Sequence, residues 1–187
     1  MNSNSKIKKA HRTLLMIGMF SVIMLFAGLT SAYIVSKGSL GSKWDIIILP
    51  YEFYISTAMI LISSFFGYFA TKNSVYNNPN MISKSILFTI IFGVLFFVCQ
   101  ILGWNSLTND GKFLSGNNVA SSYLYVLTFA HLLHLTGGLV ALIIVYIKSI
   151  QKKYNSENNN GLILAIRFWH FLAILWIYLL LFLVFIN

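Results

Sequence analysis

The sequence predicts an all-α integral membrane protein, built as a bundle of five transmembrane helices. Hydrophobic residues fill 58% of the 187 positions, charged residues fill only 9%, and the mean hydropathy is +0.78. Soluble domains of this size are much less apolar. A bilayer-spanning helix needs about 20 mostly apolar residues, and five such runs lie at about 14–36, 50–70, 85–107, 123–147 and 162–186. Their connections are short, so residues 14–187 are expected to form one membrane domain.

The distribution of basic residues predicts the orientation. Ten of the 13 lysines and arginines precede the first run or flank the second and fourth connections. Three of the four acids lie in or beside the first and third connections. By the positive-inside rule, the basic leader at residues 1–13 is cytoplasmic and the C-terminal Asn187 is outside. Topology and attraction to anionic lipid heads account for the net charge of +9, so no nucleic-acid partner is expected.

The fourth run carries the most informative polar residues. On a helical wheel, His131, His134, Gly137 and Gly138 fall within about a third of the circumference. We expect this face to pack closely against protein, because polar and small residues in membrane helices mark helix contacts. The opposite side is plain hydrocarbon and is expected to face lipid: Leu132, Leu135, Leu139, Leu142 and Ile143.

Each of the other runs also has one distinctive face, and helix packing is the favoured interpretation of all four. In the first run this face holds Gly18, Ser21, Leu25, Gly28 and Ala32. In the second it holds Glu52, Ser56, Ser63, Gly67 and Ala70. In the third it holds Thr89, Gly93, Phe96, Gln100, Gly103 and Trp104. In the fifth it holds Trp169, His170, Ala173 and Trp176.

Two polar residues lead to specific expectations. Gln100 lies at a depth similar to His131 and His134, and an unpaired polar group in hydrocarbon is costly. The sequence therefore predicts a hydrogen bond from Gln100 to one of these histidines. Glu52 follows Pro50 into the first helical turn, where the exposed amides favour a carboxylate. This structural interpretation is preferred over a proton-carrying role.

The sequence contains few residue patterns that would support catalysis or cofactor binding. There is no paired carboxylate, no nucleophile with a credible base and no phosphate-binding loop. Two axial haem ligands should be nearly level, but His134 and His170 differ in depth by about 8 Å. A metal site of His131, His134 and Cys99 matches in depth, but Cys99 points about 100° away from Gln100. We therefore expect no catalytic, cofactor-binding or metal-binding residue in this chain.

Four segments resemble helices of cytochrome c oxidase subunit III, found in haem-copper terminal oxidases. The run FAHLLHLTGGLVAL is similar to the family helix with two histidines three apart and a glycine-rich turn. RFWHFLAILWIYLLLFL resembles the last helix, with its Trp-His-Phe signature. MLFAGLTSAYIV and FTIIFGVLFFVCQILGW match two further helices of the family. The resemblance covers all five runs in order and corresponds to the short bacterial form that lacks two N-terminal helices.

The resemblance implies a subunit without redox centres, packed on the catalytic subunit I that holds the haems and copper. It implies a plasma-membrane protein that supports assembly and proton uptake in aerobic electron transport and that binds phospholipid in a cleft. Structural or lipid-contacting roles are implied for Gln100, Trp104, His131, His134, Trp169 and His170. By its charge and its depth, about one turn inside the cytoplasmic end, Arg167 is a candidate for binding a phospholipid head group.

The chain departs from the family pattern where acids are usual, since Val22, Ile163 and Ala173 stand near those places. These losses put a carboxylate role in proton uptake in doubt. Two other functions stay open at this point. One is a homologous accessory subunit of a nitric oxide reductase, and the other is an independent histidine-ligated membrane cytochrome. A small transporter is less favoured because no inverted repeat is visible.

Overall fold

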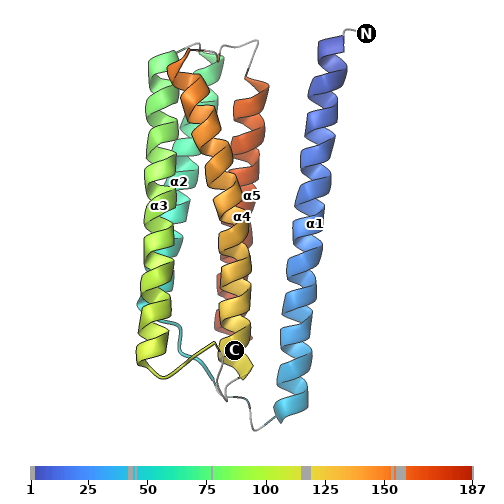
Figure 1. Ribbon diagram of the computed structural model, residues 1–187, viewed down its shortest axis with the longest axis vertical. Coiled ribbons are helices and arrows are strands. Elements are labelled where there is room, and N and C mark those ends of the chain that lie inside the picture. The colour runs from blue at the N-terminus through green and yellow to red at the C-terminus, as the bar shows by residue number, and fades with distance from the viewer. Residues whose placement is uncertain are drawn as a thin grey trace.

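The computed structural model describes residues 3–41, 44, 46–76, 78–114, 119–152, 154 and 159–186, which form five α-helices and no strand. The helices are α1 (Ser3–Leu40), α2 (Tyr51–Val75), α3 (Pro79–Asn109), α4 (Val119–Ile150) and α5 (Asn160–Phe185). Successive helices run in opposite directions, and α1 stands beside the bundle of the other four (Figure 1). All five are long and apolar enough to cross a membrane, which confirms the predicted fold class. The predicted sidedness stays a prediction, and Asn187 lies outside the described residues.

Every helix is longer than the apolar run that predicted it. Residues 3–13, expected to precede the first helix, form its first turns, and α3 begins at Pro79. Proline suits a first helical position, and the side chain of Asn78 accepts a hydrogen bond from the Met81 amide at 3.4 Å. Hydropathy marks only the part of a helix that lies in hydrocarbon. The backbone hydrogen bonds continue into the polar segments on either side, which explains the difference.

Close helix packing occurs where small residues face large rings. A Cβ atom added to Gly93 would lie 2.8 Å from the Trp169 ring, and one added to Gly103 would lie 2.8 Å from Phe53. At Gly138 the added atom would meet Leu172 at 3.0 Å. These glycines therefore allow α3 and α4 to approach large side chains of α2 and α5. The faces predicted to pack on the second, third and fifth helices lie in this core, where Trp104 and His170 are half-buried and their other named residues are buried.

The packing expected for the first helix is not found within the chain. Gly18, Ser21, Leu25, Gly28 and Ala32 are all exposed. A Cβ atom added to Gly18 or Gly28 would meet nothing within 4 Å. Helix α1 instead buries a face of larger residues against α4 and α5: Val22, Phe26, Thr30 and Tyr33. Bulky side chains fill the wider space between these helices, so the small face points away from them.

The predicted division of the fourth helix into a protein face and a lipid face is partly wrong. Leu132, Leu135 and Leu142, expected to face lipid, are buried. Gly137, expected to be closely packed, would meet nothing within 4 Å if it carried a Cβ. Helix α4 contacts α3, α5 and α1, so more than one face is covered. A single polar stripe cannot indicate how many neighbours a helix has.

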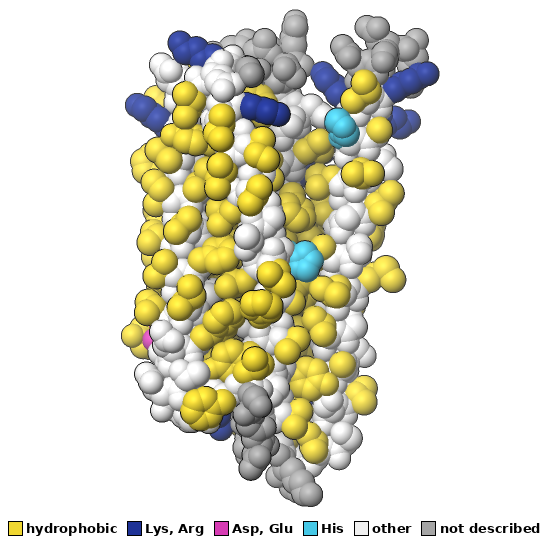
Figure 2. Space-filling model, viewed as in Figure 1, with side chains coloured by type: hydrophobic (Ala, Val, Ile, Leu, Met, Phe, Trp, Pro, Cys, Tyr) yellow, Lys and Arg dark blue, Asp and Glu magenta, His cyan; other side chains and the backbone are white. Residues whose placement is uncertain are grey.

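Charged side chains divide the bundle into two ends. Lysine and arginine side chains gather where α1 begins (Figure 2). This end, where α2 and α4 finish and α3 and α5 begin, is called the basic end. The two acids that the structure describes, Glu52 and Asp110, lie at the opposite end of the bundle.

Candidate functional site

Buried polar contacts join α2 to α3 and α5 at several levels of the bundle. The amide of Gln100 on α3 donates a hydrogen bond to the hydroxyl of Ser56 on α2 at 2.7 Å. The indole N–H of Trp169 on α5 donates to Ser63 at 3.0 Å, and Ser63 donates to the Thr89 carbonyl at 2.7 Å. These pairs satisfy polar groups that lipid could not, so they fix which helices are neighbours.

The predicted hydrogen bond between Gln100 and a histidine is wrong. Both ring nitrogens of the fully buried His131 lack a partner among the described residues, as does the Oε1 atom of Gln100. The His131 ring instead lies among aromatic rings, with centroids 6.2 Å from Phe26, 6.1 Å from Phe96 and 5.2 Å from Trp176. Similar depth does not ensure contact, because the direction in which each helix turns its side chains also decides it. Ser56 is the better partner because α2 and α3 are antiparallel neighbours with a short connection.

His134 lies at the boundary between α4 and α1. Its Nδ1 atom lies 2.7 Å from the Ala130 carbonyl oxygen. A carbonyl oxygen can only accept, so Nδ1 carries a proton and donates. The ring also lies against Phe26 of α1, with centroids 5.7 Å apart. His134 thus contributes to the contact between α1 and the bundle. Gly137, which was predicted to share its face of the helix, does not.

The remaining site residues make separate helix-to-helix contacts. Trp104 donates to the Thr128 hydroxyl at 3.1 Å, which joins α3 to α4. His170 pairs through Nδ1 with the hydroxyl of Ser64, which joins α5 to α2. The hydroxyl partners Ser64 and Thr128 were not among the predicted site residues. The signal available for them was a serine or threonine within an apolar run, which membrane helices use as hydrogen-bonding partners.

Glu52 occupies the first turn of α2, directly after Pro50, as its sequence position indicates. It is buried at 9% exposure, and its Oε1 atom accepts a hydrogen bond from Ser106 of α3 at 2.6 Å. Its Oε2 atom has no partner among the described residues. The carboxyl group thus joins the start of α2 to the end of its antiparallel neighbour α3.

No metal-type cluster occurs within the part of the chain that the structure describes. No three histidine, cysteine or acidic side chains there lie close enough together to hold an ion. Cys99 is free and partly buried. The expectation that this chain carries no cofactor stays a prediction. Gln100, Trp104, Trp169 and His170 each pair with a hydroxyl group of another helix, and these separate pairs do not form one convergent centre.

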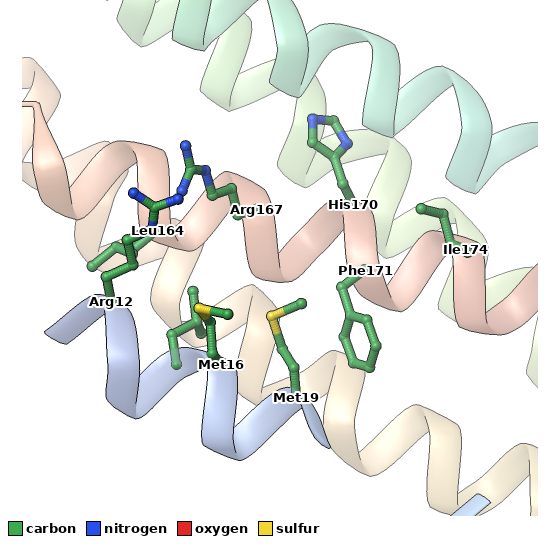
Figure 3. Close-up of a pocket in the computed structure, with 9 residues that line it drawn as sticks. Arg12, Met16, Met19, Leu164, Arg167, His170, Phe171 and Ile174 are labelled. Carbon is green, nitrogen blue, oxygen red and sulfur yellow. The ribbon is translucent and has the colours of Figure 1, made fainter. Parts of the chain in front are cut away.

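A cavity between α1 and α5 has two arginines in its wall. Arg12 of α1 and Arg167 of α5 line a cavity of about 370 Å³, together with Leu15, Met16, Met19, Leu164, His170, Phe171 and Ile174. Figure 3 shows both guanidinium groups at one end of this cavity, beside Leu164, with the methionines and Phe171 further along it. The cavity therefore combines a cationic end with an apolar interior.

Comparison with known proteins places the chain in a family. The family model for cytochrome c oxidase subunit III matches residues 2–187. The chain is 27% identical over 159 residues to the probable cytochrome c oxidase subunit 3 of Mycobacterium leprae, covering 84% of this chain and 78% of that protein. It is 28% identical over 166 residues to the corresponding protein of Nocardia farcinica, with the same coverage. It is also 26% identical to cytochrome c oxidase subunit 3 of Aedes aegypti, over 67% of this chain and 46% of that protein.

The fold and its paired polar contacts define a multi-pass helical membrane protein whose polar residues serve contacts between helices. Together with the match over nearly the whole chain, they identify the family. The chain belongs to the cytochrome c oxidase subunit III family, and membership implies a complex with other oxidase subunits. The resemblance seen in the sequence is confirmed.

Proposed function

We propose that this chain is the non-catalytic subunit III of a haem-copper respiratory oxidase, packed on the catalytic subunit in a bacterial plasma membrane. The main support for the proposal is the set of hydrogen bonds made by the side chains that resemble the family's motifs. Trp104, Trp169 and His170 each pair with a hydroxyl group on another helix. Side chains committed to such pairs support a scaffold and offer no reactive group to a substrate.

The proposed role has three parts: assembly of the oxidase, phospholipid binding and support of proton uptake by the catalytic subunit. Arg167 is exposed near the start of α5, so its guanidinium is available to a lipid phosphate. Val22 and Ala173 stand where acids are usual in the family. Any effect on proton uptake would therefore act through packing and lipid rather than through a carboxylate at those positions. With the basic end facing the cytoplasm, Arg167 would lie on the inner leaflet.

Purification of the tagged chain from its native membrane in mild detergent tests this function. We expect a large haem-copper subunit to co-purify and the haem absorbance to stay with that partner when the chain is stripped away. Recovery of the chain alone with bound haem would overturn the proposal and identify a membrane cytochrome. Recovery with a nitric oxide reductase would assign the accessory role to that enzyme instead.

Substitution of His134 separates an assembly role from a cofactor role. His134→Leu removes the polar ring that contacts α1 and Ala130, so less intact oxidase should be recovered after detergent extraction. The absorbance maxima of the haems should not move, because the haems lie in another subunit. Val140→Leu is the matched control on the exposed face of the same helix and should leave recovery unchanged. A shifted haem maximum in His134→Leu would contradict the non-catalytic assignment.

A further inference from the structure

His134 places a polar ring at the middle of the membrane-spanning region. It stands midway along α4, which runs for 32 residues from Val119 to Ile150, so the ring lies near the centre of the bilayer. Its Nδ1 atom donates to the Ala130 carbonyl oxygen at 2.7 Å. In a neutral imidazole whose proton is on Nδ1, the Nε2 atom is a hydrogen-bond acceptor. His134 therefore presents one acceptor at a depth where water is absent.

This acceptor has no partner among the residues that the structure describes. The two ring nitrogens of His131 are enclosed by the chain, whereas the Nε2 atom of His134 is accessible at the surface. Figure 2 shows a histidine side chain at the surface about midway between the two ends of the molecule, at the boundary of α4 and α1. Lipid acyl chains carry no hydrogen-bond donor, so an unpaired acceptor at this place is costly.

The neighbours of His134 on α4 leave its ring open to another helix. Gly137 lies about one turn further along α4, and a Cβ atom added to it would meet nothing within 4 Å. Leu133 precedes the histidine and is 58% exposed. The missing side chain of Gly137 allows a neighbouring backbone to come close, because small residues permit tight contacts between membrane helices.

Helix α1 supplies the other half of this surface. The hydroxyl of Ser36 lies 2.8 Å from the hydroxyl of Tyr123 on α4, so the side of α1 that carries Ser36 borders α4. Leu25 and Ala32 lie within about 40° of that side on a helical wheel, and both are exposed. The residues around the ring and the ring itself are called the His134 surface: Leu25, Ala32, Leu133, His134 and Gly137.

We propose that the His134 surface binds a transmembrane helix of the catalytic haem-copper subunit. That helix donates a hydrogen bond from a hydroxyl, indole or amide side chain to the Nε2 atom of His134. Polar residues at the middle of a membrane helix ordinarily pair with protein, and lipid offers no substitute for the donor. Family membership supplies other oxidase subunits as neighbours. This inference rests on the proposed function and deepens it by naming the surface and the hydrogen bond.

The hydrogen bond is tested by substitutions that keep or remove the acceptor. His134→Phe removes the acceptor and keeps a ring against Phe26, whereas His134→Gln places an amide oxygen near the position of Nε2. His11→Phe, at an exposed histidine near the start of α1, is the matched control. The haem recovered for each tagged chain is measured over a series of detergent concentrations.

We expect His134→Phe to weaken retention of the catalytic subunit about fivefold, because a hydrogen bond between membrane helices contributes about that factor. His134→Gln and His11→Phe should behave as wild type. Equal retention by wild type and His134→Phe would overturn the proposal.

The abundance of the tagged chain in the native membrane separates binding from folding. His134→Phe should be as abundant as wild type, because a phenyl ring preserves the contact with Phe26, whose centroid lies 5.7 Å from that of His134. If abundance falls as much as haem recovery does, His134 acts within the chain and the proposed hydrogen bond is wrong.

Photo-crosslinking locates the partner while His134 stays in place. Leu133→p-benzoylphenylalanine puts a reactive ketone on the His134 surface, and Val94→p-benzoylphenylalanine on the exposed face of α3 is the matched control. In intact membranes, the chain should crosslink to the haem-copper subunit from position 133 and not from position 94. Crosslinks from position 133 to lipid alone would overturn the proposal, as would a protein crosslink from position 94 only.

The same experiments distinguish this inference from the function on which it rests. If wild type co-purifies with the haem-copper subunit but position 133 gives no crosslink to it, the inference fails while the accessory function stands. If wild type is recovered from its membrane with no haem-copper subunit, the accessory function itself fails.

Discussion

The bundle of α2 to α5 and the single helix α1 use glycine in opposite ways. In the bundle, Gly93 and Gly103 lie so close to aromatic rings that a Cβ atom would approach them to 2.8 Å. In α1, Gly18 and Gly28 meet nothing within 4 Å. The glycines of the bundle are therefore closely packed by other helices, whereas the small-residue face of α1 lacks a packing partner among the described residues. A small-residue stripe indicates that a helix can approach another closely, and it does not say which helix.

The largest expected effect comes from enlarging a covered glycine. Gly93→Leu places a side chain where the Trp169 ring lies, so the helices must separate, at a cost of about 3 kcal/mol or more. Gly28→Leu, at an uncovered glycine, should change the free energy of unfolding of the isolated chain by no more than about 0.5 kcal/mol. Denaturation of the purified chain in detergent micelles measures both. Equal destabilisation by the two variants would remove the distinction between the bundle and α1.

A smaller effect is expected from removing a polar contact in each region. Trp169→Phe loses the hydrogen bond to Ser63 and leaves space in a fully buried site, which should cost about 1–3 kcal/mol. Tyr178→Phe loses the contact between α5 and Thr30 of α1. Its cost should be about 0.5 kcal/mol, because Tyr178 is 46% exposed and Thr30 also donates to the Phe26 carbonyl. The same denaturation measurement compares them, and the reverse order would contradict the assignment of the bundle as the stable core.

The smallest expected effect on stability concerns Tyr154, which lies between α4 and α5 at the basic end of the bundle. Tyr154 packs beside Ala70, Ile82, Ile86, Val145 and Leu162. Burial raises the pKa of Tyr154 above its ordinary value near 10. The folded chain therefore binds the phenolic proton more tightly than the unfolded chain, so this contribution to stability is present below pH 10 and is lost as the pH rises further. Unfolding midpoints of wild type and Tyr154→Phe from pH 8 to 11 test this, and the variant should lose less stability above pH 10. Parallel curves for the two proteins would contradict a shifted pKa.

The candidate site shows where sequence reasoning succeeds and where it stops. The depth of Gln100 and its need for a partner could be read from the helix repeat. The identity of that partner could not, because a rotation of one helix about its axis exchanges the histidine for Ser56. The pairing of Trp169 and His170 with hydroxyl groups could not be predicted either. Serine and threonine are common in apolar runs, and their spacing in the sequence does not indicate which of them will be a partner. Only one arginine of the α1 cavity could be predicted from the sequence. Arg167 was distinctive because of its depth in the helix, whereas Arg12 resembled the other basic residues of the N-terminal segment.

The sequence by itself determined the membrane class, the number of spanning helices and the family. These depend on the length of apolar runs and on the order of short motifs, which are local properties of the chain. Only the tertiary structure decided that Leu132, Leu135 and Leu142 of α4 are buried, that Gly137 is uncovered and that the small-residue face of α1 is exposed. Such features depend on how many neighbours surround each helix and at what rotation, and these follow from packing among all five helices together.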